Sequence, residues 1–319
     1  MLQVIKDQYM DYHTFIHEIT NLVEGKMGKG YSARVYKILK NNSLELDSLV
    51  VLKESKNFAP NIYLMPYFEA YLEGTSLSEL AERICGSCVT SAVPTDDNNF
   101  TFAFSSMKPY IVHRLINYEK NRKLLDRIPH IRYLDLAVTY HCLVRNDEQG
   151  IGTIRITNDH LDVWETDVNE ISLLAGKNTS RIFPAEIRCM DEVIRDLIGE
   201  GVSDIGEGQI SGSGIPDQQL SGEKKRKRMY ILTNQKGING ASCMLYEHVL
   251  KRFSRQIQSD FYILPSSIHE IILVPYHNKI SKEALCDMVK EVNLTQVLPE
   301  EVLSDQVYLY SADQNAIIM

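Results

Sequence analysis

Two short apolar runs near the carboxyl end constrain the fold of this chain more than any other feature. They are Phe261 to Pro265 and Glu270 to Pro275, and Ser266-Ser267-Ile268-His269-Glu270 forms a polar corner between them. Apolar runs of this length, bounded by turn residues, are typical of buried β-strands. We therefore expect two buried strands joined by a corner that carries the densest set of reactive side chains in the chain.

The rest of the chain mixes helical and extended patterns without regular alternation. Apolar residues at helical spacing predict helices at residues 8–25, 77–85, 105–125, 242–256 and 282–292. Period-two alternation or short apolar runs predict strands at residues 31–39, 46–53, 133–144, 152–156, 229–233, 307–310 and 316–318. Since no glycine-rich strand-to-helix turn occurs, we expect an α+β fold with mixed or antiparallel sheets and packed helices.

Residues 133–144 give the clearest strand of the amino-terminal half. Leu136, Val138 and Tyr140 alternate with the more polar Thr139 and His141. This pattern predicts one packed face and one lightly covered face.

A glycine-rich segment divides the chain. Residues 201–222 contain six glycines and four serines, which is typical of a flexible linker or insertion. We expect an amino-terminal α+β portion at residues 1–100 and a main α+β body formed by residues 101–200 and 223–319.

Bulk composition limits the class of protein. The 319 residues carry a net charge of −8, which argues against a surface that coats nucleic acid everywhere. No apolar run reaches the roughly 18 residues that span a bilayer, and the first residues lack a signal-peptide pattern. Six cysteines are few for this length, and we expect a cytoplasmic protein with no membrane partner.

A local basic segment runs from Lys108 to Arg132, with seven basic residues against two acidic ones. On the helix expected there it forms a candidate binding surface for an acidic protein or RNA. The alternative is a solvated helix face with internal salt bridges. The candidate binding residues are Arg114, Lys120, Arg122, Lys123 and Arg127. A second basic run, residues 224–228, is interpreted as a solvated end of the linker.

Two cysteines, Cys85 and Cys88, have the spacing of a redox or zinc site. A redox pair needs the start of a helix to lower the thiol pKa, whereas this pair follows a predicted helix. A zinc site needs two more ligands, and no second pair with this spacing exists. We therefore prefer a structural pair and keep metal binding as the alternative.

The polar corner offers a hydroxyl, an imidazole and a carboxylate as catalytic candidates at Ser266, Ser267, His269 and Glu270. On an extended chain His269 and Glu270 face opposite sides, so they do not form a catalytic pair without a bulge. The preferred interpretation is that the serines satisfy backbone groups at a tight corner and His269 bonds a main-chain carbonyl.

Several segments along the chain form a recognisable set: Asp135–Thr139, Ile154–Asn158, Asn178-Thr179, Tyr230–Asn234, Gly240–Cys243, Leu264–Pro275, Asn293–Gln296 and Glu301–Asp305. Taken together, these segments resemble a bacterial domain-of-unknown-function family common in anaerobic gut bacteria. The resemblance covers nearly the whole chain. It implies a bacterial, cytoplasmic origin and no particular chemistry, cofactor or substrate.

The patterns favour a non-catalytic binding or regulatory protein acting on a macromolecule. The sequence contains no complete catalytic constellation, but it does contain a segment that could attract an anionic partner. The alternative is a small-molecule enzyme whose site forms where Asn158, Asn234, Ser266 and His269 meet. Residues 237–241 lack the Lys-Ser/Thr ending of a phosphate-binding loop, so we predict no cofactor.

Overall fold

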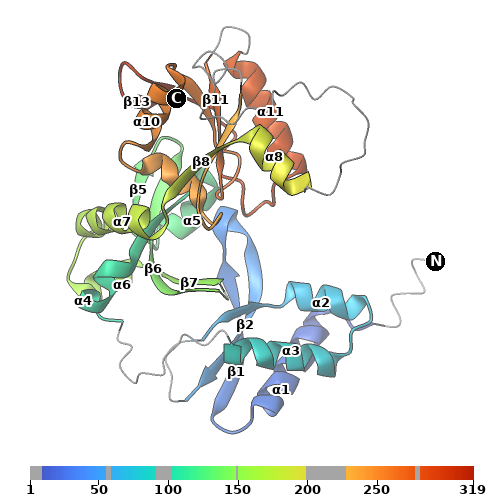
Figure 1. Cartoon of the computed structure of the whole chain (residues 1–319). Coiled ribbons are helices and arrows are strands. Elements are labelled where there is room, and N and C mark those ends of the chain that lie inside the picture. Colours follow the sequence, from blue (N-terminus) through green and yellow to red (C-terminus); the bar gives the residue numbers. More distant parts are fainter. Residues whose placement is uncertain (1–8, 55–58, 91–101, 149, 199–227, 277–280) are drawn as a thin grey trace, which may run out of the picture. The chain divides into compact units, whose positions relative to one another are not determined.

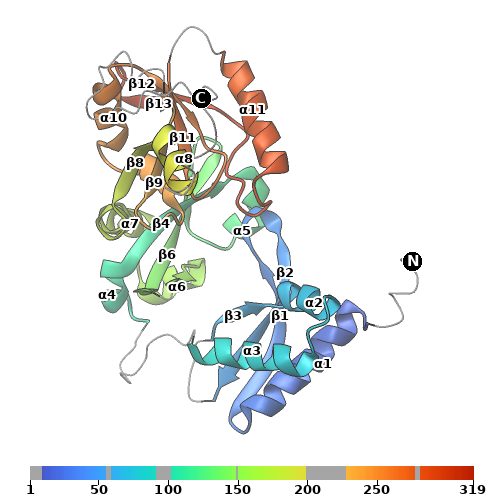
Figure 2. The same ribbon diagram turned by 45° about the vertical axis from the view of Figure 1, so that its right-hand side comes forward.

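The computed structural model describes residues 9–54, 59–90, 102–148, 150–198, 228–276 and 281–319. It divides into two compact units, whose elements are drawn from two directions in Figures 1 and 2. Unit 1 comprises Met1–Thr101 and Val144–Gly152, and unit 2 comprises Phe102–Leu143 and Thr153–Met319. The linker predicted at residues 201–222 lies outside the described residues, as does the basic run except Arg228.

Unit 1 contains a three-stranded antiparallel sheet with helices packed on it. Its elements are α1 (Tyr12–Met27), β1 (Tyr31–Leu39), η1 (Asn41–Ser43), β2 (Glu45–Lys53), β3 (Asn61–Tyr63), α2 (Met65–Leu72) and α3 (Leu77–Thr90). The strand order is β1-β2-β3, and the two strands predicted at residues 31–39 and 46–53 are confirmed and pair with each other. Phe15, Ile19 and Val23 of α1 are fully buried against this sheet and α3.

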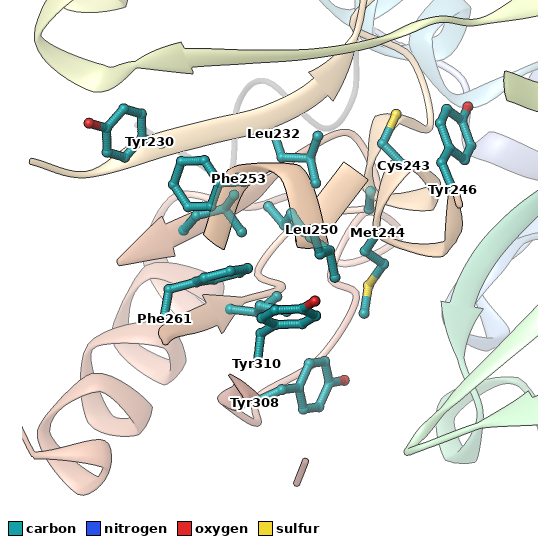
Figure 3. Close-up of a cluster of buried hydrophobic side chains, with 14 of the residues drawn as sticks. Tyr230, Leu232, Cys243, Met244, Tyr246, Leu250, Phe253, Phe261, Tyr308 and Tyr310 are labelled. Carbon is teal, nitrogen blue, oxygen red and sulfur yellow. The ribbon is translucent and has the colours of Figure 1, made fainter. Parts of the chain in front are cut away.

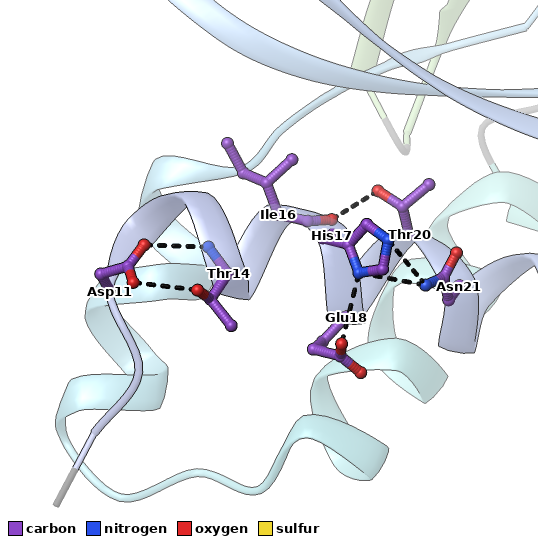
Figure 4. Close-up of polar contacts among 7 residues, drawn as sticks. All are labelled: Asp11, Thr14, Ile16, His17, Glu18, Thr20 and Asn21. Carbon is purple, nitrogen blue, oxygen red and sulfur yellow. Dashed lines mark hydrogen bonds and ion pairs between the residues drawn. The ribbon is translucent and has the colours of Figure 1, made fainter.

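Helix α1 begins at a strong capping residue. The Asp11 carboxylate accepts hydrogen bonds from the Thr14 amide at 3.0 Å and the Thr14 hydroxyl at 2.9 Å (Figure 4). These bonds satisfy an amide that the first turn of a helix leaves without a partner. They also hold the pKa of the Asp11 carboxyl below its ordinary value. The cap explains why the helix begins at Tyr12 and not at residue 8.

The other two sheets are also antiparallel. Most of their residues belong to unit 2, but Val144–Gly152, at the ends of two paired strands, belongs to unit 1. The four-stranded sheet has the order β4-β6-β5, with β7 also paired to β6, and the six-stranded sheet has the order β13-β12-β10-β11-β9-β8. The strands are β4 (Ile111–Asn117), β5 (His130–Tyr133), β6 (Leu136–Asp147), β7 (Gly150–Arg155), β8 (Ala185–Cys189), β9 (Tyr230–Asn234), β10 (Phe261–Leu264), β11 (Ile271–Pro275), β12 (Tyr308–Ser311) and β13 (Ala316–Ile318).

Short and long helices connect and cover these strands. They are α4 (Phe104–Met107), η2 (Lys108–Tyr110), η3 (Glu119–Asn121), α5 (Arg122–Leu125), α6 (Asn158–Trp164), α7 (Val168–Ile182), α8 (Met190–Ile198), η5 (Gly240–Leu245), α10 (Val249–Ile257) and α11 (Lys282–Thr295). The α+β prediction is confirmed, and all three sheets are antiparallel. Within the described parts of the chain, no helix has the length and apolar character needed to cross a membrane.

The centre of unit 2 is the pair of strands that the apolar runs predicted. In β10, Phe261 and Ile263 pack with α10 and η5 on one face, whereas Tyr262 and Leu264 pack with α11 on the other. Figure 3 shows Phe253 of α10 within the first of these clusters. Because both faces are covered, every residue of β10 is buried, which explains the continuous apolar run.

The helix predicted at residues 105–125 is wrong. The chain there forms α4, η2, the strand β4, η3 and α5. Ile111, Val112, Leu115 and Ile116 match a helical stripe, but in β4 they face both sides of a sheet and all are buried. A strand covered on both faces has no period-two signal, so its sequence resembles that of a buried helix.

Two smaller predictions also need correction. The polar face of β6 is not lightly covered, because Thr139 and His141 are 1% and 7% exposed. The helix predicted at residues 242–256 is two elements, η5 and α10, separated by His248 in the left-handed region with φ 68°. A non-glycine residue with that φ interrupts helical hydrogen bonding.

Candidate functional site

The polar corner before β11 is held by one internal hydrogen bond and by contacts from two other segments. The Ser267 hydroxyl accepts from the His269 amide at 3.0 Å, and the Thr233 hydroxyl donates to the His269 carbonyl at 2.8 Å. The amide of Ala241 donates to the Ile268 carbonyl at 3.2 Å. These bonds fix the backbone of the corner against β9 and η5.

The His269 imidazole joins two segments distant in sequence. Its Nδ1 lies 3.3 Å from the Asn239 amide, and its Nε2 lies 3.2 Å from the Glu301 carboxylate. Since a backbone amide only donates, Nδ1 accepts and Nε2 carries the proton toward Glu301. The main-chain partner of His269 is therefore an amide and not the predicted carbonyl. Its carboxylate partner is Glu301, which sequence reasoning missed.

The catalytic candidates do not form a nucleophile–base pair in this geometry. Within the described residues, neither Ser266 nor Ser267 places its hydroxyl in a hydrogen bond with the His269 ring. Activation of a serine requires that bond. The hydrogen bonds of the corner join it to β9, η5 and the Glu301 segment.

The alternative enzyme site would need Asn158 beside Asn234. The Asn158 amide and side chain instead bond the carbonyls of Arg127 and Asp126. The Asn234 side chain donates to the Ile238 carbonyl at 2.9 Å, in the turn that also carries Asn239. Asn234 thus satisfies its own turn, which is a common role of asparagine, whereas Asn158 ties the start of α6 to the segment that follows α5.

The two cysteines of unit 1 lie on α3, packed against the core that contains α1. Burial raises the pKa of the Cys85 thiol, and burial followed by the neighbouring Cys85 raises the pKa of Cys88 to about 11. Among the described residues, no three His, Cys, Asp or Glu side chains are grouped to hold a metal ion. The raised pKa values indicate thiols that are protonated at neutral pH, and metal binding by this pair stays a prediction.

These thiols are expected to alkylate slowly. With a pKa near 11, Cys88 holds about 100-fold less thiolate at neutral pH than a thiol with the ordinary value of 9.0. Iodoacetamide labelling with peptide mass spectrometry should show this, with the urea-unfolded chain as the control. Equal labelling rates in folded and unfolded protein would contradict the assignment.

The candidate binding residues fall into two groups. Lys120 is ion-paired with Asp305 at 3.6 Å, and Arg122 with Glu119 at 3.4 Å. Lys123, at the start of α5, is exposed. So is Arg127, which follows α5, whereas Arg114 lies on β4 and is half-buried. Arg114 therefore differs from the other four candidate binding residues, because it lies on a strand and is half-buried.

Tyr118 contacts two exposed arginines, Arg122 and Arg132. The guanidinium carbon of Arg122 lies 4.9 Å from the centre of its ring, and that of Arg132 lies 4.5 Å away. The Arg122 Nη1 also donates to the Tyr118 hydroxyl at 2.9 Å. Contacts of this kind between a guanidinium group and an aromatic ring hold the arginine side chains in place. We call Tyr118, Arg122, Lys123, Arg127 and Arg132 the basic surface.

A buried polar network was also missed by sequence reasoning. The Asp135 carboxylate accepts from the Tyr308 hydroxyl and, at 2.6 Å, from the Ser304 hydroxyl. Burial, followed by the nearby Asp135 charge, raises the pKa of Tyr308. The side-chain amide of Asn117 donates to the Leu303 carbonyl at 2.9 Å. These bonds join β4 and the loop before β6 to the segment before β12, and no local pattern predicts such distant pairs.

The model of a protein family of unknown function, DUF5688, matches residues 12–312. The chain belongs to this family. No curated protein and no solved structure matches the DUF5688 chain. The family resemblance expected from the sequence is thus confirmed at the level of a domain of unknown function. The gut-anaerobe distribution, the bacterial origin and the cytoplasmic location stay predictions.

Proposed function

We propose that this DUF5688 protein is a non-catalytic binding or regulatory protein whose basic surface contacts an anionic macromolecule. The observation that supports the proposal is the placement of Arg122 and Arg132 over Tyr118. Lys123 and Arg127 are exposed on the same segment, and within the described structure neither is ion-paired. Such a surface presents positive charge together with flat guanidinium groups.

Single-stranded RNA is the partner class that this chemistry favours. Phosphates are attracted by the lysine and arginine charges, and unpaired bases stack on guanidinium and aromatic planes. An acidic protein would use the charges but would gain little from the stacked planes. The overall charge of −8 limits RNA contact to this surface.

The double change Lys123→Glu, Arg127→Glu is expected to weaken RNA binding by at least about tenfold at low salt, because two attractive charges become repulsive. Fluorescence anisotropy with a labelled single-stranded RNA at two salt concentrations measures this. The matched control is Lys177→Glu, Arg252→Glu, which makes the same charge change at exposed positions on α7 and α10.

The outcomes separate the partner classes. Loss of binding in the surface variant alone supports RNA contact at the basic surface. Equal loss in both variants indicates a general charge effect and contradicts the proposal. Binding of polyglutamate but not RNA by the wild-type protein would assign the surface to an acidic protein instead.

A further inference from the structure

The turn between β5 and β6 contacts two members of the basic surface through its backbone. Leu134 and Asp135 lie between these two paired strands and form the whole of the turn. The Asp135 carbonyl accepts a hydrogen bond from the Tyr118 amide at 2.9 Å, and the Leu134 carbonyl accepts one from the Arg132 Nε at 3.3 Å. The turn thus holds both partners of the Tyr118–Arg132 contact.

The backbone conformation of this turn is unfavourable for its own sequence. Leu134 has a φ of 57°, in the left-handed region that glycine and asparagine adopt more readily than a residue with a branched side chain. Hairpin turns of two residues usually place glycine, asparagine or aspartate at such positions. A conformation of this kind persists where surrounding contacts impose it. The turn therefore depends on contacts with other parts of the chain.

The Asp135 carboxylate supplies such contacts. It accepts hydrogen bonds from the Tyr308 hydroxyl and, at 2.6 Å, from the Ser304 hydroxyl, and both donor residues are fully buried. Burial, followed by the Asp135 charge, raises the pKa of Tyr308, so its hydroxyl keeps the proton that it donates. Hydrogen bonds to a carboxylate are stronger than those between neutral groups. They anchor the turn to β12 and the segment before it.

We propose that Asp135 is a positioning residue of the basic surface. Its carboxylate fixes the turn, and the carbonyls of the turn hold Tyr118 and Arg132 in the arrangement that contacts single-stranded RNA. This inference rests on the proposed function, because it assigns a role within the same surface. A negative charge beside a site for RNA is unfavourable by itself, so the contribution of Asp135 comes from the order that it imposes.

Asp135→Ala gives opposite results for charge and for positioning. Loss of a negative charge alone would strengthen RNA binding. Loss of positioning weakens it, because Tyr118 and Arg132 must then be ordered when the RNA binds. We expect the affinity for a labelled single-stranded RNA at low salt to fall by about fivefold, measured by fluorescence anisotropy. Asp135→Asn, which keeps an acceptor oxygen, should bind more tightly than Asp135→Ala. Equal or tighter binding of Asp135→Ala than of wild type overturns the proposal.

Amide hydrogen exchange measured by NMR tests the positioning without RNA. The Tyr118 amide should exchange at least about tenfold faster in Asp135→Ala than in the wild type, whereas the Leu232 amide in the centre of the six-stranded sheet should be unaffected. Equal acceleration at both amides would indicate a general loss of stability and contradict the proposal, as would unchanged exchange at Tyr118. If the wild type binds no RNA, the proposed function fails, and exchange at Tyr118 alone decides whether Asp135 orders the surface.

Tyr308→Phe provides the second variant if Asp135→Ala does not fold. It removes one hydrogen bond to the Asp135 carboxylate and leaves every charge in place, so a loss of RNA affinity reports position alone. Tyr310→Phe on the same strand is the matched control, because its hydroxyl donates to Asn315 at 2.8 Å and not to the turn. We expect about threefold weaker RNA binding and faster Tyr118 exchange for Tyr308→Phe only. The same behaviour in both variants overturns the proposal.

Discussion

Gly240→Ala is expected to lower the free energy of unfolding of unit 2 by about 3 kcal/mol. A Cβ at this position would lie 2.1 Å from the Thr233 hydroxyl, 2.5 Å from the His269 carbonyl and 2.8 Å from the Asn234 amide nitrogen. Two of these three atoms are backbone. The Thr233–His269 hydrogen bond that anchors the corner must therefore break or the strands must move apart.

The only tryptophan, Trp164, lies in unit 2 and is 8% exposed, so its fluorescence reports the unfolding of this unit in urea. Gly176→Ala is the matched control. Gly176 lies in α7 with nothing within 4 Å of an added Cβ. Alanine there should raise the free energy of unfolding by up to about 1 kcal/mol. Equal stability of Gly240→Ala and wild type would show that β9 and η5 do not approach as closely as described.

The corner shows what the sequence could predict and what it could not. The apolar runs and the serines predicted the strands and the turn, because both signals are local. Glu301 lies 32 residues from His269, and nothing near either residue indicates their contact. Gly240 was likewise recognisable as a turn residue only. Its close contact with Thr233 depends on packing between β9 and η5, which no local pattern records.

The basic segment shows the opposite case, in which a local pattern misled. Ile111, Val112, Leu115 and Ile116 satisfy helical spacing, yet the pairing of β4 with β6 buries both of its faces. The helical assumption placed Arg114 on the same exposed surface as Lys123. The strand instead turns Arg114 toward His141, which sequence analysis had placed on a lightly covered face. For Arg114 and His141, the pairing of β4 with β6 decides the environment of the side chain, and the local sequence pattern does not.

The aromatic core of unit 2 should be the least tolerant part of the chain. Phe253 is 1% exposed, and its ring centre lies 5.0 Å from that of Tyr230 and 5.0 Å from that of Phe261 (Figure 3). The Phe261 ring in turn stacks on Tyr310 at 4.9 Å. These rings come from α10, β9, β10 and β12, so one side chain supports a helix and three strands of the sheet.

Phe253→Ala is therefore expected to reduce the free energy of unfolding by about 4 kcal/mol, from lost burial and the cavity left behind. Phe253→Leu should reduce the free energy of unfolding by less, about 1 to 2 kcal/mol, because leucine keeps most of the side-chain volume. Urea unfolding followed by Trp164 fluorescence measures both. Leu294→Ala on α11, where the side chain is 86% exposed, should change stability by no more than about 0.5 kcal/mol. A loss below about 1 kcal/mol for Phe253→Ala would mean that α10 does not pack on this sheet as described, because a cavity of that size in a rigid core cannot be neutral.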